Sequence, residues 1–200
     1  MKKTLIKGLL AVVTVATVLF ACKKEETKSS LKPEKLIAQK CLQESKGAST
    51  SSASPYNVYL YKITDNQDGT FTWEWRIRNL NPGNGSNGTV QDLSHWNIDL
   101  GDCITAENII SGSTSTNGTT WTPITKKNLV IKQDKSQDCY ADPIFKFDVG
   151  TTDSDISYYR LTINKNVSHT AVTAVYKSGK NTGCGVFTTC GFGCSASDNN

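Results

Sequence analysis

The sequence predicts an all-β fold, an antiparallel β-sandwich of the immunoglobulin-like kind that is stapled by disulfides. Three observations predict it. Residues 71–78 (FTWEWRIR) alternate strictly between apolar and polar side chains, as a strand does when one side is buried and the other faces solvent. Similar stretches recur after residue 55 with turn-forming residues between them, and no helical period occurs there. Of the seven cysteines, six follow Cys22, an even number that suits disulfides in an exported chain.

The first hairpin is expected from residues 56–64 and 71–78, which are both rich in aromatic and β-branched side chains. Residues 65–69 (DNQDG) join the two strands, and the Asp-Gly pair supplies the turn. The stretch DNQDGTFTWEW resembles the first hairpin of bacterial surface β-sandwich modules, which implies that fold for this chain.

The remaining strands are expected in shorter apolar or alternating stretches. The predicted strands are 93–100, 128–132, 144–149, 157–163, 170–177 and 186–189. The Gly-, Asn-, Ser- and Thr-rich stretches between them, above all 81–88 and 111–120, are predicted to be loops.

The four tryptophans divide into two groups. Trp73 and Trp75 share the apolar face of their strand, and Trp96 follows the same alternation, so all three are predicted to lie in the core. Trp121 lies in a polar stretch, residues 118–123, and is the tryptophan expected to meet a ligand. The alternative for Trp121 is a loop aromatic that folds back over the core.

The amino terminus has a basic head, residues 1–7, and an uncharged apolar run, residues 8–21, shorter than the roughly 20 residues that span a bilayer. Together they predict a signal peptide over residues 1–21. The run ends in Leu19-Phe20-Ala21-Cys22, which resembles the lipobox of bacterial lipoproteins. The resemblance implies cleavage before Cys22, a diacylglycerol on its thiol, and an acyl chain such as palmitate on its amino group. A plain signal peptide with a chance cysteine is the alternative.

Lys24-Glu25-Glu26 resembles the surface-export signal of some Gram-negative lipoproteins. This implies a lipid-anchored protein of the outer membrane that faces the cell exterior; alternatively, these charges simply begin a tether. Residues 22–55 are expected to form the tether, with a short helix at 33–45 and a flexible linker after it. The domain then spans residues 56–194, and residues 195–200 form a disordered tail.

The charge of the chain argues against nucleic acid as a partner. The formal net charge of +4 includes three lysines within residues 1–21, whose removal leaves +1. No basic surplus then remains to attract a polyanion non-specifically. The expected partners are the membrane, through Cys22, and a glycan or protein ligand, and no cofactor is expected.

The cysteines are expected to form disulfides, and the predicted members are Cys41, Cys103, Cys139, Cys184, Cys190 and Cys194. At least one of the last three should pair with a distant partner, for which Cys103 and Cys139 are the best candidates. Cys41, in the tether, is the member least expected to pair. A metal site is the alternative, although no Cys-x-x-Cys pair occurs.

The sequence contains little that supports a catalytic or a metal-binding site. His95 shares a strand face with Asn97, opposite Trp96, so it is predicted to be a surface histidine and a candidate ligand contact. No nucleophile elbow or oxyanion loop accompanies it. The candidate calcium ligands are Asp65, Asp68, Asp153 and Asp155. Neither of their loops has the glutamate of an EF-hand, and Asp is also a common turn residue, so no metal site is predicted.

The sequence therefore predicts an outer-membrane, surface-exposed lipoprotein that acts as a non-enzymatic binding or adhesion module for a glycan or a protein. A structural subunit of an envelope assembly, joined through strand addition at a sheet edge, is the first alternative. A small hydrolase is the second.

Overall fold

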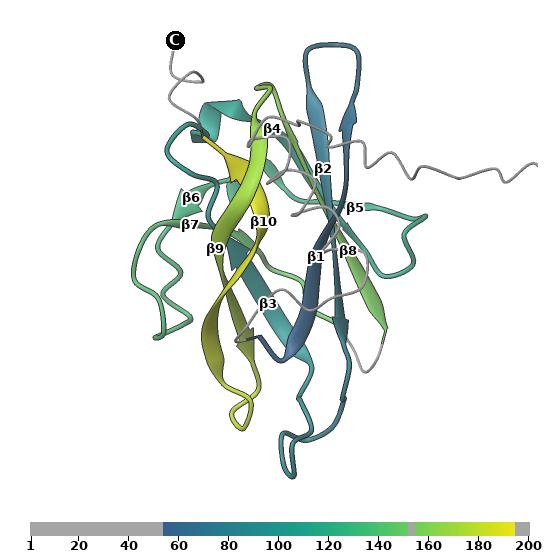
Figure 1. Ribbon diagram of the computed structural model, residues 1–200, viewed down its shortest axis with the longest axis vertical. Coiled ribbons are helices and arrows are strands. Elements are labelled where there is room, and N and C mark those ends of the chain that lie inside the picture. Colours follow the sequence, from purple (N-terminus) through teal and green to yellow (C-terminus); the bar gives the residue numbers. More distant parts are fainter. Residues whose placement is uncertain (1–53, 152–154, 195–200) are drawn as a thin grey trace, which may run out of the picture. The chain divides into compact units, whose positions relative to one another are not determined.

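Two antiparallel sheets of five strands each pack face to face around one hydrophobic core (Figure 1). The computed structural model describes residues 54–151 and 155–194. The predicted signal peptide, the lipidation site Cys22, the tether, Cys41 and the carboxy-terminal tail lie outside these residues. Among the described residues, no helix has the length and apolar character needed to span a membrane.

The first sheet has the strand order β1-β2-β8-β4-β5. Its strands are β1 (Tyr56–Asp65), β2 (Phe71–Asn79), β8 (Ile156–Ile163), β4 (Ile109–Ser115) and β5 (Thr122–Pro123). The second sheet has the order β10-β9-β3-β7-β6. Its strands are β10 (Cys184–Gly193), β9 (Ser168–Ser178), β3 (Leu93–Ile98), β7 (Ile144–Phe147) and β6 (Ile131–Lys132). Two 3-10 turns, Ala106–Asn108 and Lys126–Asn128, lie in the connections.

The strand order confirms the predicted fold class. The runs β1-β2-β8-β4 and β10-β9-β3 match the A-B-E-D and G-F-C sheets of immunoglobulin domains. The connectivity differs in one respect. Here β7, which pairs with the C-like strand β3, follows the D-like strand β4 in the chain rather than preceding it.

One predicted loop was wrong. Residues 111–120 were expected to be irregular, but Ile109–Ser115 forms β4, which pairs with β8 along its length. The sequence IISGSTS lacks an apolar alternation, so the ladder with its neighbour must hold this strand in place. A Cβ at Gly112 would come within 3.0 Å of Ile124 and Leu129, so glycine allows the following segment to pack closely. The strand expected at 128–132 covers only Ile131–Lys132 in the structure, and residue 128 belongs to a 3-10 turn instead.

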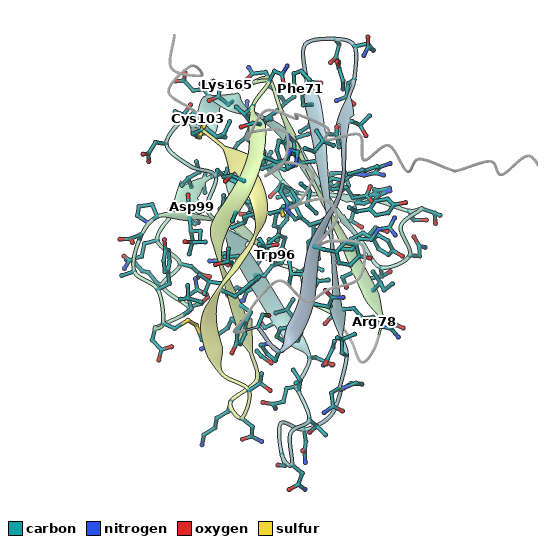
Figure 2. All side chains as sticks on the ribbon, in the orientation of Figure 1. Phe71, Arg78, Trp96, Asp99, Cys103 and Lys165 are labelled. Atoms are coloured by element: carbon teal, nitrogen blue, oxygen red, sulfur yellow. A yellow bond between two sulfur atoms is a disulfide. The ribbon has the colours of Figure 1, made fainter. Side chains whose placement is uncertain are left out.

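The core is built around three tryptophans, as predicted. Trp73, Trp75 and Trp96 are at most 1% exposed. The Trp75 ring meets Trp96 edge-on at 6.1 Å between centroids, and its indole N–H donates to the Cys190 carbonyl at 2.8 Å. These contacts join β2 of one sheet to β3 and β10 of the other, and Trp96 lies between the sheets (Figure 2).

Within residues 54–151 and 155–194, two disulfides join segments that are distant in the chain. Cys103 pairs with Cys194 at a Cα–Cα distance of 5.4 Å, and Cys139 pairs with Cys184 at 6.0 Å. Two of the three carboxy-terminal cysteines therefore pair with the two predicted partners rather than holding a metal. Cys190 is also disulfide-bonded.

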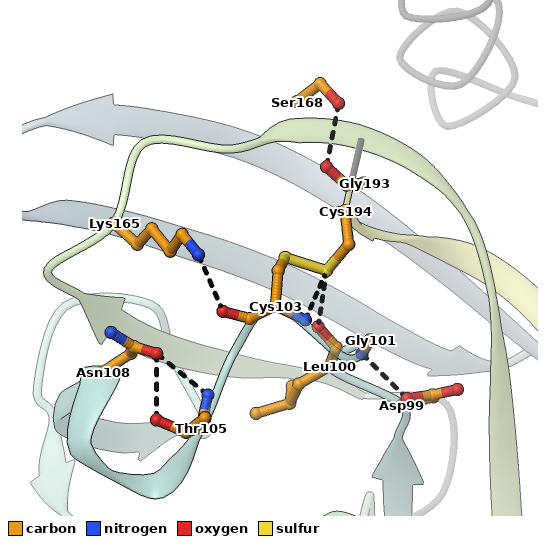
Figure 3. The surroundings of a disulfide bond; sticks show 10 residues. All are labelled: Asp99, Leu100, Gly101, Cys103, Thr105, Asn108, Lys165, Ser168, Gly193 and Cys194. Carbon is orange, nitrogen blue, oxygen red and sulfur yellow. Dashed lines mark hydrogen bonds between the residues drawn. A yellow bond between two sulfur atoms is a disulfide. The ribbon is translucent and has the colours of Figure 1, made fainter. Parts of the chain in front are cut away.

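Hydrogen bonds surround the Cys103–Cys194 disulfide and hold the end of β10 (Figure 3). Lys165 Nζ donates to the Cys103 carbonyl at 3.1 Å. Ser168 Oγ donates to the Gly193 carbonyl at 3.0 Å. The glycine-rich end of the domain is thus fastened both covalently and by side chains of the neighbouring segment.

Candidate ligand-binding face and pocket

The strand register of the first sheet brings outward-facing aromatic and charged side chains into rows. Residues that pair across neighbouring strands point to the same side of a sheet. One row runs across β1, β2, β8 and β4 as Lys62, Glu74, Arg160 and Ser113. The next row runs across the same strands as Tyr59, Arg76, Tyr158 and Ser115. Both rows lie on the side of the sheet away from the core.

A β-bulge in β1 adds another aromatic ring to this side. The register shifts between Leu60 and Lys62, which leaves Tyr61 as the extra residue. Tyr61 is 46% exposed, and the guanidinium carbon of Arg76 lies 3.2 Å from the centroid of its ring. The bulge also changes the parity of the strand, so that Ile63 packs against the core.

A buried carboxylate holds the cations of this face in place. Glu74 is only 2% exposed. Arg160 Nε donates to its Oε2 atom at 2.9 Å, Arg160 Nη2 lies 2.9 Å from the same atom, and Arg76 Nη2 lies 3.4 Å from Oε1. Lys62 Nζ lies 3.9 Å from the same carboxylate. Three cations thus surround one carboxylate, so the face has a positive surplus.

Trp121 lies on this outer side and does not fold over the core. Arg160 covers one side of its indole, with the guanidinium carbon 3.5 Å from the ring centroid, and Tyr158 meets it edge-on at 6.4 Å. Asn117 Oδ1 stabilises the loop before it by accepting hydrogen bonds from two following backbone N–H groups. A Cβ at Gly118, whose φ is +72°, would come within 2.9 Å of the Tyr158 ring. We call this surface the aromatic–arginine face; it comprises Tyr59, Tyr61, Lys62, Arg76, Trp121, Tyr158 and Arg160.

The prediction that His95 is a surface histidine was wrong. The side chain is 4% exposed, although it does lie on the side of β3 opposite Trp96. The connection between β6 and β7 covers this side of the sheet. Its residue Asp134 places Oδ2 at 2.9 Å from His95 Nε2 and at 3.2 Å from Asn97 Nδ2.

Asp134 is the centre of a polar cluster under this connection. Its Oδ1 accepts from the backbone N–H and the hydroxyl of Ser136 at 3.0 and 2.6 Å. Lys146 Nζ lies 3.4 Å from its Oδ2 and 3.1 Å from Asp148 Oδ1. The side chain is 7% exposed, and all of these donors favour the ionised form of the carboxyl group.

The pKa values of Asp134 and His95 in this cluster are both lower than usual. Burial alone would raise the pKa of the Asp134 carboxyl, but hydrogen bonds from Ser136 and Asn97 and the charge of Lys146 hold it well below its usual range. Burial and the Lys146 ammonium lower the pKa of His95, and together they outweigh the opposite effect of Asp134. At pH 7 the histidine is therefore neutral beside an ionised aspartate.

The cluster does not have the order of a nucleophilic relay. In a relay the histidine stands between the nucleophile and the carboxylate. Here the Ser136 hydroxyl donates directly to Asp134 at 2.6 Å and lies 3.4 Å from His95 Nε2, which already contacts the same carboxylate. The geometry instead fits a structural role for this polar cluster, which holds the β6–β7 connection against β3 and β7.

A pocket opens beside this polar cluster, with a volume of about 380 Å³. It is lined by Asn128, Val130, Lys132, Gln133, Asp134, Lys135, Ser136, Lys146 and Asp148. Residues from β6, β7 and the connection between them therefore converge on it.

Two of the four candidate calcium ligands, Asp65 and Asp68, stabilise the β1–β2 turn. Asp65 Oδ1 accepts from the Gln67 backbone N–H at 2.8 Å, and Asp68 Oδ1 accepts from the Thr70 backbone and hydroxyl at 2.9 and 2.6 Å. Asp155 is exposed, and Asp153 lies outside the described residues. Across residues 54–151 and 155–194, no three His, Cys, Asp or Glu side chains gather as metal ligands.

The two sheets and the disulfides define the class of the protein as a disulfide-bonded antiparallel β-sandwich. No protein-family model matches the sequence, and no curated protein matches it either.

Proposed function

We propose that this protein is a lipid-anchored module of the outer membrane, facing the cell exterior, that binds an acidic glycan through the aromatic–arginine face. The single observation that carries this proposal is the packing of guanidinium groups against aromatic rings on an outer sheet face. The anchoring part rests on the resemblance of Leu19-Phe20-Ala21-Cys22 to a lipobox.

Aromatic rings suit sugars because a ring offers a flat apolar surface against the apolar face of a pyranose. The exposed Tyr61 and the partly exposed Trp121 supply such surfaces at the two lateral ends of the face, on β1 and next to β5. Both are buttressed by arginines that Glu74 holds in position, so little side-chain entropy would be lost on binding.

The charge of the face favours an acidic ligand. Lys62, Arg76 and Arg160 surround one carboxylate, and arginine can donate two parallel hydrogen bonds to a carboxylate or a sulfate. An acidic polysaccharide offers both sugar rings and anionic groups at intervals along one chain.

A glycan array probed with the purified full chain tests this proposal. Trp121→Ala and Tyr61→Ala should each weaken binding to acidic glycans by about tenfold, the equivalent of roughly 1.4 kcal/mol. Val186→Ala is the matched control, because it removes an exposed apolar side chain (41% exposed) from the other sheet. Retention of full affinity in both aromatic variants, or an array that binds no glycan, would contradict the proposal.

A further inference from the structure

The pocket beside Asp134 lies on the second sheet and shares no residue with the aromatic–arginine face. We propose that it is a separate binding site for a small ligand that bears one anionic group, a carboxylate, sulfate or phosphate. This inference goes beyond the proposed function and does not depend on it.

Three lysines from different elements converge on the pocket. Lys132 belongs to β6, Lys135 to the β6–β7 connection and Lys146 to β7. Lys146 is engaged by Asp134 and Asp148. Within the described part of the chain, neither Lys132 nor Lys135 forms an ion pair. Two ammonium groups are therefore available to a ligand.

The carboxylates of the pocket are already occupied. Both oxygens of Asp134 accept hydrogen bonds, Oδ1 from Ser136 and Oδ2 from Asn97, and His95 Nε2 lies 2.9 Å from Oδ2. Asp148 pairs with Lys146 at 3.1 Å. The pocket is thus lined by three lysines and two aspartates, both paired with Lys146, and it has a net positive charge that complements an anion.

The backbone around the pocket is held in place. Asp134 fastens the connection to His95 of β3 and to Lys146 of β7, and the Cys139–Cys184 disulfide ties the far end of the connection to β10. A fixed backbone loses little conformational entropy when a ligand binds, so the entropy cost falls on the exposed side chains of Lys132 and Lys135.

The size and the donor type narrow the ligand class. A volume of about 380 Å³ lies at the small end of the roughly 300–1,000 Å³ range of ligand pockets, and it suits a molecule of monosaccharide size. Lysine ammonium groups act as point charges and do not read the planar shape of an anion. The site therefore recognises charge, and carboxylate, sulfate and phosphate probes must be compared.

Isothermal titration of the full chain with sodium glucuronate, sodium sulfate and sodium phosphate, at constant ionic strength, tests the proposal. At least one probe should bind saturably, with a dissociation constant on the order of 1 mM or tighter. Glucuronate binding without sulfate or phosphate binding identifies a carboxylate sugar as the ligand type, and the reverse identifies a tetrahedral oxyanion.

The double variant Lys132→Gln/Lys135→Gln should weaken the binding of that probe by about tenfold or more. Lys126→Gln/Lys127→Gln is the matched control, because it removes two exposed lysines from the neighbouring 3-10 turn, outside the pocket lining. The control should leave the affinity unchanged. Trp121→Ala should leave it unchanged as well, which separates this site from the proposed glycan face.

Two results would overturn the proposal. One is the absence of saturable binding for all three probes. The other is an equal loss of affinity in the two double variants, because it would assign the binding to the overall charge of the domain rather than to this pocket.

Discussion

The Nε2 atom of His95 lies 2.9 Å from the Oδ2 atom of Asp134, and both side chains are buried. This contact fastens the β6–β7 connection onto the outer side of β3. Asp134 also lines the pocket that we assign to an anionic ligand. The stability of the connection and the shape of the pocket therefore depend on the same carboxylate.

Asp134→Asn should lower the free energy of unfolding by about 2–4 kcal/mol, because it removes the charge that Lys146 and several hydrogen-bond donors face. Chemical denaturation of the variant and the parent measures this change. Asp148→Asn is the control: its carboxylate is 68% exposed, so the loss should stay below about 1 kcal/mol. Equal effects of the two changes would show that Asp134 has no special role in holding the connection.

The stability of the domain should fall on acidification in two stages. The pKa values of His95 and Asp134 are lower in the folded protein than in an unfolded chain, so the unfolded chain binds protons more readily in the intervening pH range. The His95 contribution should decline below about pH 6.5, and the Asp134 contribution below about pH 4. Unfolding free energies across this range, for the parent and for His95→Gln, measure the two stages. A first stage that persists unchanged in His95→Gln would contradict the assignment of a neutral histidine.

Trp75→Ala should destabilise the domain by about 3–5 kcal/mol, as expected for truncation of a large buried aromatic side chain. Trp75 is fully buried, contacts Trp96 and donates a hydrogen bond to the Cys190 carbonyl. Thermal and denaturant unfolding measure the effect, with Trp121→Ala as a comparison that removes an indole outside the core. If Trp121→Ala were the more destabilising of the two, the outer face would be a structural element rather than a binding surface.

Cys22→Ser should release the protein from the membrane fraction and leave the fold of the domain intact, because the proposed anchor precedes the sandwich in the chain. Membrane fractionation measures release, and the unfolding midpoint of the released protein measures the fold. Incorporation of labelled fatty acid that continues in Cys22→Ser would contradict the proposed lipidation.

Several features of the domain followed from local sequence patterns. The alternation in residues 71–78 correctly placed Trp73 and Trp75 in the core, because side-chain direction in a strand depends only on its two-residue repeat. The β1 bulge also has a local signature in the sequence, although the strand expected at 56–64 included no bulge. The inward apolar positions run through Leu60 and then resume at Ile63, a change of parity that requires one extra residue.

Other features depended on contacts between distant residues. The sequence by itself determined that His95 and Trp96 lie on opposite sides of their strand, but only the tertiary structure decided that the His95 side is covered, by a connection that carries Asp134. In the same way, the sequence placed Glu74 on the solvent side of its strand, while the pairing of β2 with β8 brought Arg160 against it and buried it. Strand periodicity is a local property of the backbone, whereas burial of a polar side chain is decided by which distant segment supplies its hydrogen-bond partner.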